Sequence, residues 1–107
     1  RGFRFLLDYN KEKNMLFVIH ALDGKDSLPK RQANYAAHKE HLDKDKEYGV
    51  RIVMSGPLVA DDMNTRIGSH FIVDAPFLDN VEAFHQADSF YSAGVWKDVQ
   101  ITMFIKN

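Results

Sequence analysis

The chain has 107 residues, of which 45% are hydrophobic, and its 14 Lys and Arg against 15 Asp and Glu give a formal net charge of -1. One domain with a substantial core is therefore the default, and nucleic acid is not an expected partner, because no segment concentrates basic residues among aromatic ones. The absence of cysteine excludes disulfides, thiolate zinc sites and cysteine nucleophiles.

The first residues differ in character from the rest of the chain. The segment RGFRFLLDYNKEKN ends in a polar, charged run, whereas Met15 opens a stretch of clean periodicity. We therefore expect an N-terminal extension over residues 1–14 and one domain over residues 15–107. No apolar run approaches the ~18 residues that cross a bilayer, and the N-terminus lacks the layout of a secretory signal. These features predict a cytoplasmic protein with no membrane partner.

The run MLFVIHAL, residues 15–22, predicts a strand that ends at the turn signal DGKD. Residues 27–49 then predict a helix, with Asp26 or Ser27 as its N-cap and Gly49 as its stop. The chain therefore opens with a strand followed by a long helix.

The second half of the chain predicts four more elements. Strands are expected over residues 50–59 and 69–76, a short helix over residues 78–88, and a long alternating strand over residues 95–106. The order is thus β-α-β-β-α-β, which is the ferredoxin-like α+β arrangement. It predicts a four-stranded antiparallel sheet with two helices on one face.

Strand alternation predicts what covers each face of this sheet. On the last strand one set of residues alternates on the apolar face, which should lie under the helices: Val99, Ile101, Met103 and Ile105. The first strand is apolar on both of its faces. Helices on one side leave the other side bare, so we expect a homodimer whose sheets pack together through their open faces.

The first helix places two polar side chains beside its apolar stripe. At about 100° per residue, Leu28, Tyr35 and Leu42 define the stripe that should be buried, with Arg31 and His38 on one edge of it. A purely structural interpretation exists for both polar residues, because an arginine can extend its charged end to solvent and a histidine can be a satisfied core residue. A functional role for His38 would require a second polar group close to its ring.

The second helix offers that partner. Val81, Phe84 and Asp88 fall on its inward face, and Asp88 lies near the helix C-terminus, where the backbone dipole disfavours an anion. A half-buried carboxylate there needs hydrogen bonds or a cation. His38 could meet Asp88 in the groove between the helices, where the carboxylate would fix the imidazole tautomer for general acid or base catalysis. The alternative is that Asp88 only caps the turn DSFYSAG.

Several short motifs in this order resemble the YciI-like (YCII-related) family. They are MLFVIHALDGKDSLPKR, AAHKEHL, SGP, GS at residues 68–69, and ADSFYSAGVW. The resemblance runs from residue 15 to about residue 105 and implies a dimeric ferredoxin-like α+β barrel, related to muconolactone-isomerase-like proteins, with a His/Asp site in a cleft. The family's helix histidine falls on His38 and its "DP-aromatic" aspartate on Asp88. The proline of that motif is replaced here by Ser89, which makes the turn less rigid.

The resemblance also implies a reaction class, since a relative removes chloride from a chlorinated hydroxyhydroquinone. The first hypothesis is a cofactor-independent enzyme that eliminates or isomerises a small aromatic or enolisable metabolite. His38 would transfer the proton, Asp88 would orient the His38 imidazole, and Arg31 would attract an anionic oxygen. Further candidates, ranked lower, for binding polar substrate atoms are Ser55, the backbone amide of Gly56, Ser69 and Tyr91. No metal and no cofactor are expected.

Two alternatives stay open at this stage. The chain could be a non-catalytic dimer that binds a small ligand or serves as an accessory module. It could also bind a metal through His20, His70 and a neighbour, which alternation places on one sheet face, although no close-spaced motif supports such a site. His41 and His85 are expected on exposed helix faces.

Overall fold

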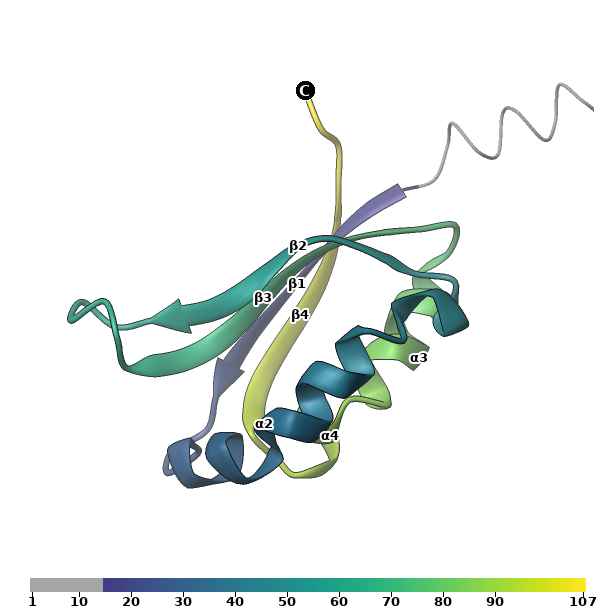
Figure 1. The fold of residues 1–107 in the computed structure, drawn as a ribbon. Helices are drawn as coiled ribbons and strands as arrows, with labels where there is room; N and C mark the ends of the chain where they lie inside the picture. The colour runs from purple at the N-terminus through teal and green to yellow at the C-terminus, as the bar shows by residue number, and fades with distance from the viewer. Residues whose placement is uncertain (1–14) are drawn as a thin grey trace, which may run out of the picture.

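The computed structural model describes residues 15–107, which form a four-stranded antiparallel sheet with helices on one face (Figure 1). In chain order the elements are β1 (Met15–Asp23), α2 (Leu28–Leu42), the short 3-10 helix η1 (Asp45–Tyr48), β2 (Arg51–Val59), β3 (Arg66–Ala75), α3 (Leu78–Gln86), α4 (Ser89–Ser92) and β4 (Trp96–Phe104). The sheet order is β2-β3-β1-β4. The predicted ferredoxin-like α+β fold is confirmed, and the extension predicted over residues 1–14 lies outside the described residues.

The core lies between the helices and the side of the sheet that faces them. Phe17, Ile19 and Ala21 of β1 point into it and are fully buried. Val99 and Ile101 of β4 pair with Ala21 and Ile19 and pack against the same core, as predicted. Among residues 15–107, no helix has the length and apolarity to span a membrane.

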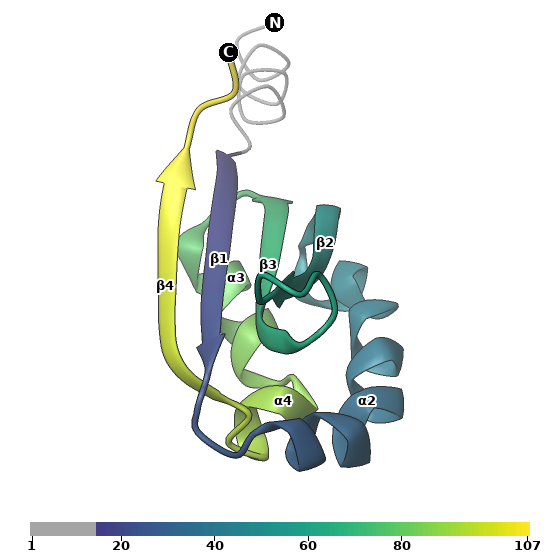
Figure 2. The same ribbon diagram turned by 90° about the vertical axis from the view of Figure 1, so that its left-hand side faces the viewer.

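The prediction that Met103 and Ile105 lie under the helices is wrong. Met103 keeps the same face as Val99 and Ile101, because it pairs with Phe17, but both it and Ile105 are largely exposed. β4 is an edge strand, and its C-terminal end extends past the helical layer (Figure 2). Alternation therefore predicted the facing of Met103 correctly, and the burial of both side chains incorrectly.

Helix α2 is rotated about its axis relative to the prediction. Leu28 and Tyr35, the expected buried stripe, are 44% and 55% exposed, and Leu42 is half-buried, whereas Arg31 and His38 are buried. The reason is that each buried polar side chain has a partner on another element that replaces the hydrogen bonds of water. The apolar stripe instead lines a cleft beside the helix.

Two more histidines are buried where exposure was predicted. The ring of His41 stacks on that of Phe84, and its Nε2 atom donates a hydrogen bond of 2.7 Å to the carbonyl oxygen of Phe84. His85 of α3 stacks on Trp96, with ring centroids 4.9 Å apart. Aromatic stacking and one backbone acceptor thus hold side chains that a polarity scale assigns to solvent.

The long helix also ends earlier than predicted. α2 stops at Leu42, and η1 follows after a short break. Gly49 ends η1 rather than α2, and its φ of 74° requires glycine, because the left-handed region disfavours other residues. Ser27 is the N-cap residue of α2, but its hydroxyl donates to the carbonyl oxygen of Val95 at 2.7 Å instead of capping the helix.

Within residues 15–107, the helices all lie on one side of the sheet and none covers the opposite side (Figures 1 and 2). We call it the open sheet face; the register places on it the apolar side chains of Leu16, Val18, Leu22, Met54, Leu58, Ile72 and Phe104 and the polar side chains of His20, Arg51, His70, Asp74, Asp98, Gln100 and Thr102. His20 and His70 are cross-strand partners with ring centroids 5.7 Å apart, which confirms that they share a face. Within residues 15–107, no group of three or more potential ligands could hold a metal ion.

Gly68 gives a test of this strand packing. A Cβ atom at Gly68 would collide with the carbonyl oxygen of Ala21 on β1 and lie 2.9 Å from Leu58 Cδ1 on β2, whereas a Cβ at Gly56 would meet nothing within 4 Å. We expect Gly68→Ala to lower the free energy of unfolding by about 1–3 kcal/mol, the usual range for overpacking. Gly56→Ala is the matched control and should change it by less than about 0.5 kcal/mol. Equal urea midpoints for the two variants would contradict this packing.

Candidate functional site

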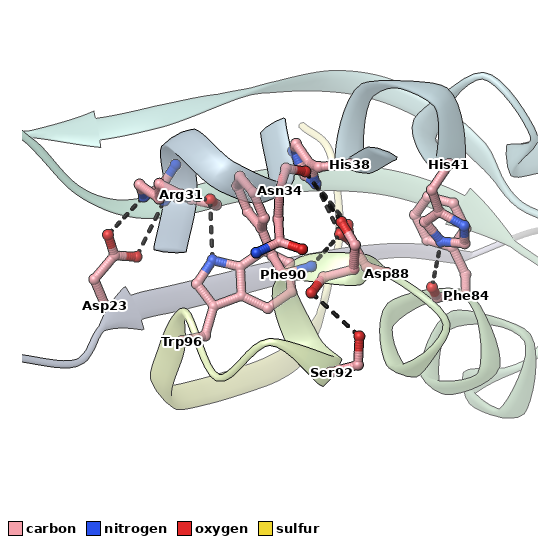
Figure 3. A network of polar contacts seen from close by, with 12 residues as sticks. Asp23, Arg31, Asn34, His38, His41, Phe84, Asp88, Phe90, Ser92 and Trp96 are labelled. Atoms are coloured by element: carbon pink, nitrogen blue, oxygen red, sulfur yellow. Dashed lines mark hydrogen bonds and ion pairs between the residues drawn. The ribbon is translucent and has the colours of Figure 1, made fainter. Parts of the chain in front are cut away.

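The carboxylate of Asp88 joins helices α2 and α4 at the base of the candidate site. Asp88 is 2% exposed, and each of its oxygens lies 2.8 Å from Nδ1 of His38 on α2 (Figure 3). Oδ1 also accepts the backbone N–H of Phe90 at 2.9 Å. Asp88 is therefore both the cap of α4 and the partner of His38, so the two interpretations of this residue are compatible.

The position of Asp88 in the helices differs from the prediction. α3 ends at Gln86, and Asp88 is the N-cap of α4 rather than the last turn of the preceding helix. The backbone N–H of Phe90, in the first turn of α4, therefore donates to its carboxylate, an interaction that stabilises the anion. The electrostatic penalty predicted from the helix C-terminus does not arise.

Aromatic rings hold the imidazole of His38 in place. Phe90 stacks on it with ring centroids 3.9 Å apart and planes 2° apart, while Trp96 and Phe71 meet it edge to face at 6.2 and 6.3 Å. An ionised carboxylate accepts hydrogen bonds only, so we assign the proton of the neutral ring to Nδ1. Nε2 then carries the free lone pair, and no described residue between 15 and 107 forms a hydrogen bond with it.

Ser89 stands where the family motif has proline, and it supplies a different restraint. Its hydroxyl donates to the carbonyl oxygen of Asn34 at 3.2 Å, which ties α4 to α2. Asp88 keeps an extended backbone with ψ of 138°, the conformation that a following proline would also impose. The Asp88 side chain therefore keeps its orientation toward His38 without the proline ring of the family motif.

Arg31 is part of a second buried network. Its Nε and Nη2 atoms donate to the two carboxylate oxygens of Asp23 at 2.5 and 3.1 Å, and Nη2 also donates to Ser69 Oγ at 2.7 Å. The guanidinium carbon lies 5.0 Å from the centre of the Phe90 ring. Asp23 therefore balances most of the charge that was expected to attract an anionic oxygen. Asp23 was expected only as part of the turn after the first strand. Its position at the end of that strand, next to the start of the helix that carries Arg31, was the signal that could have identified it.

A cleft of about 740 Å³ lies beside these networks, within the size range of small-molecule sites. Its walls come from α2, β2, β3 and the loop before β3: Leu28, Arg31, Gln32, Tyr35, His38, Lys39, Leu42, Ser55, Gly56, Pro57, Asn64, Thr65, Arg66, Ser69 and Phe71. Five predicted site residues line it, namely Arg31, His38, Ser55, Gly56 and Ser69. The lining holds cationic side chains and no carboxylate.

Two predicted site residues lie outside the lining. Asp88 lies behind His38 and contacts the cleft through it. Tyr91 is not brought to the cleft; it is half exposed, and its ring meets His85 edge to face at 5.3 Å. Sequence reasoning missed Phe90 and Trp96 as supports of the site, because aromatic residues at buried positions carry no signal that separates a ring under a catalytic group from ordinary core.

Comparisons with known proteins agree over nearly the whole described chain. Residues 15–105 match the family model of the YCII-related domain. The chain is 35% identical over 97 residues to "Protein YciI" of Escherichia coli and of Shigella flexneri, which covers 86% of this chain and 98% of each relative. Among solved structures it is similar to 5-chloro-2-hydroxyhydroquinone dehydrochlorinase (TftG) from Burkholderia phenoliruptrix in complex with 2,5-dihydroxybenzoquinone. The TM-score is 0.76 at 32% identity, with 87% of this chain and 96% of that one covered.

His85 lies close to Asp88 but outside the cleft. Burial lowers the pKa of His85 below its ordinary value of 6.5, and the nearby Asp88 carboxylate opposes that shift without overcoming it. Its Nε2 atom is buried, with no hydrogen-bond partner among the described residues. The folded protein therefore favours the uncharged ring of His85.

The lowered pKa of His85 predicts acid sensitivity. Below about pH 6.5 the unfolded chain binds a proton at His85 that the folded chain resists, so the free energy of unfolding falls as the pH decreases, by at most about 1.4 kcal/mol per pH unit for this one group. His85→Phe keeps an aromatic ring against Trp96 and removes the titration. Urea unfolding between pH 8 and pH 5 should show a smaller loss for the variant than for the wild type; identical losses would contradict the assignment.

Proposed function

The chain belongs to the YCII-related domain family, and from that premise we propose that it is a small enzyme whose His38–Asp88 dyad transfers a proton on an aromatic or enolisable metabolite. The observation that carries the proposal is the contact of a buried carboxylate with Nδ1 of a histidine that lines a cleft of ligand size. Such a partner fixes the tautomer, leaves Nε2 as the base and stabilises the imidazolium that forms. The chemistry needs only side chains of this chain.

The similar dehydrochlorinase supports an elimination that removes chloride from a hydroxylated ring. His38 Nε2 would first take the proton of a ring hydroxyl and return it to the ring carbon that carries chlorine, which converts the ring to its ketone tautomer. Chloride would then leave with the electron pair of the C–Cl bond, while a second hydroxyl proton passes to His38 and its O–H pair completes the quinone. The net change is the loss of one proton and one chloride. Isomerisation would use the first step alone.

The open sheet face supports a homodimer as the working form. About half of its side chains are apolar, and within residues 15–107 no helix covers them, so this face is a candidate site of self-association. Val18 and Ile72 are cross-strand partners near its middle. A two-fold axis through this face would bury the same residues of both copies.

The catalytic proposal predicts a separation of binding from turnover. We expect His38→Gln to lower kcat for anaerobic chloride release from 5-chloro-2-hydroxyhydroquinone by about 10²–10⁴-fold, the contribution typical of a general base. Its affinity for 2,5-dihydroxybenzoquinone should change by less than about tenfold, because the cleft walls remain. His41→Gln is the matched control, since His41 lies on the same helix outside the cleft lining, and it should keep full activity.

The possible outcomes separate the two leading hypotheses. Turnover that survives in His38→Gln would refute the dyad mechanism. A wild-type protein that binds these rings and releases no product would instead indicate the non-catalytic ligand-binding dimer.

The dimer proposal predicts that one buried charge is enough to separate the subunits. Ile72→Glu would place an unpaired carboxylate in an apolar interface, at a cost of several kcal/mol. Size-exclusion chromatography with light scattering should give twice the chain mass for the wild type and the chain mass for the variant. Ala36→Glu, which adds the same charge on the exposed side of α2, should remain dimeric. A monomeric wild type would contradict the proposal.

A further inference from the structure

Ser69 Oγ lies between two side chains that can only donate hydrogen bonds. Nη2 of Arg31 lies 2.7 Å from it and Nε1 of Trp96 lies 3.1 Å from it. Neither a guanidinium nor an indole N–H can accept a hydrogen bond. Both lone pairs of the Ser69 hydroxyl are therefore engaged by donors.

This arrangement determines where the hydroxyl proton must go. A hydroxyl oxygen has four tetrahedral directions, and at Ser69 they hold the bond to Cβ, two accepted hydrogen bonds and the proton. Within residues 15–107, Ser69 donates to no protein acceptor, although it is only 3% exposed. The side chain lines the cleft together with His38. The cleft is thus where an acceptor for this proton can be supplied.

We propose that Ser69 is an obligate hydrogen-bond donor to the ligand, and that it selects rings with an anionic or carbonyl oxygen, such as phenolates, enolates and quinones. The proposal rests on the proposed function in taking the cleft as the ligand site. Arg31 acts through Ser69 as a positioning residue, because its charge is paired with Asp23 while its Nη2 polarises the hydroxyl. Ser69 is not a nucleophile, since its lone pairs already accept hydrogen bonds.

The test compares two probes that differ by one oxygen. Pentafluorophenolate carries an anionic acceptor and pentafluorobenzene carries none, and fluorine NMR titration gives both dissociation constants. We expect Ser69→Ala to reduce the ratio of the two affinities by about tenfold or more, as for a lost hydrogen bond to a charged group. Binding of pentafluorobenzene should stay within about twofold. The ratio is diagnostic because Lys39 and Arg66 in the cleft also attract the phenolate and remain in the variant.

Two further variants control for folding. Ser69→Cys keeps an atom that accepts from Arg31 and Trp96 but donates more weakly, so it should lose several-fold of the phenolate preference even if Ser69→Ala fails to fold. Ser92→Ala removes an exposed hydroxyl outside the cleft and should keep the wild-type ratio. An unchanged ratio in the folded Ser69 variants would overturn the proposal.

This outcome is separable from that of the catalytic test. A wild type that releases chloride, but whose preference for the phenolate does not depend on Ser69, would contradict the proposed donor role of Ser69. The proposed His38–Asp88 mechanism would be unaffected. A phenolate preference that depends on Ser69, in a protein that shows no turnover, would support the donor role of Ser69 and contradict the proposed catalytic activity.

Discussion

A carboxylate that is 2% exposed must be paired, and the pairing of Asp88 determines how the helical layer is built. The backbone N–H of Phe90 and the ring of His38 satisfy it, so the start of α4 and the middle of α2 are held at one point. The extended backbone at Asp88 separates α3 from α4 and turns the carboxylate toward α2. Ser89 adds a second tie between the same two helices through Asn34.

The ring of Phe90 links this pair to the second buried network. His38 stacks on it, and the Arg31 guanidinium lies over it at 5.0 Å. Trp96 then contacts both networks, edge-on to His38 and as a donor to Ser69. Two polar clusters are therefore supported by one aromatic group, which restricts the motion of the side chains that line the cleft.

The sequence predicted the strands well and the orientation of α2 poorly, for one physical reason. Strand alternation depends only on local geometry, and the pairing of Val99 and Ile101 with β1 follows from it. The buried side of α2 is polar instead, because Arg31, His38 and His41 each have a dedicated partner. These partners are 8, 50 and 43 residues away along the chain, and hydrophobic periodicity contains no information about them.

Part of the site was nevertheless predictable. The helical pattern put His38 at the edge of the apolar stripe of the first helix and Asp88 on the inward face of the second, and this topology packs the two helices side by side. The contact of His38 with Asp88 is present as expected, and their catalytic roles remain a prediction. Arg31 was expected to attract an anionic oxygen with its charge. The sequence does not show that this charge is paired with Asp23 in the folded chain. Because of this pairing, Arg31 orients the Ser69 hydroxyl in the cleft and adds little net charge. The other cationic side chains of the lining are Lys39 and Arg66.

Two of the polar groups that line the cleft, the His38 imidazole and the Ser69 hydroxyl, have opposite and fixed hydrogen-bonding roles. Asp88 holds the proton of His38 on Nδ1, which leaves Nε2 as an acceptor, while Arg31 and Trp96 leave Ser69 only its donor function. A ligand that satisfies both must give a proton to one and offer an oxygen to the other. A hydroxylated ring that passes to its ketone tautomer does both at once, which is why these groups suit keto-enol chemistry better than acyl transfer, where a hydroxyl must attack.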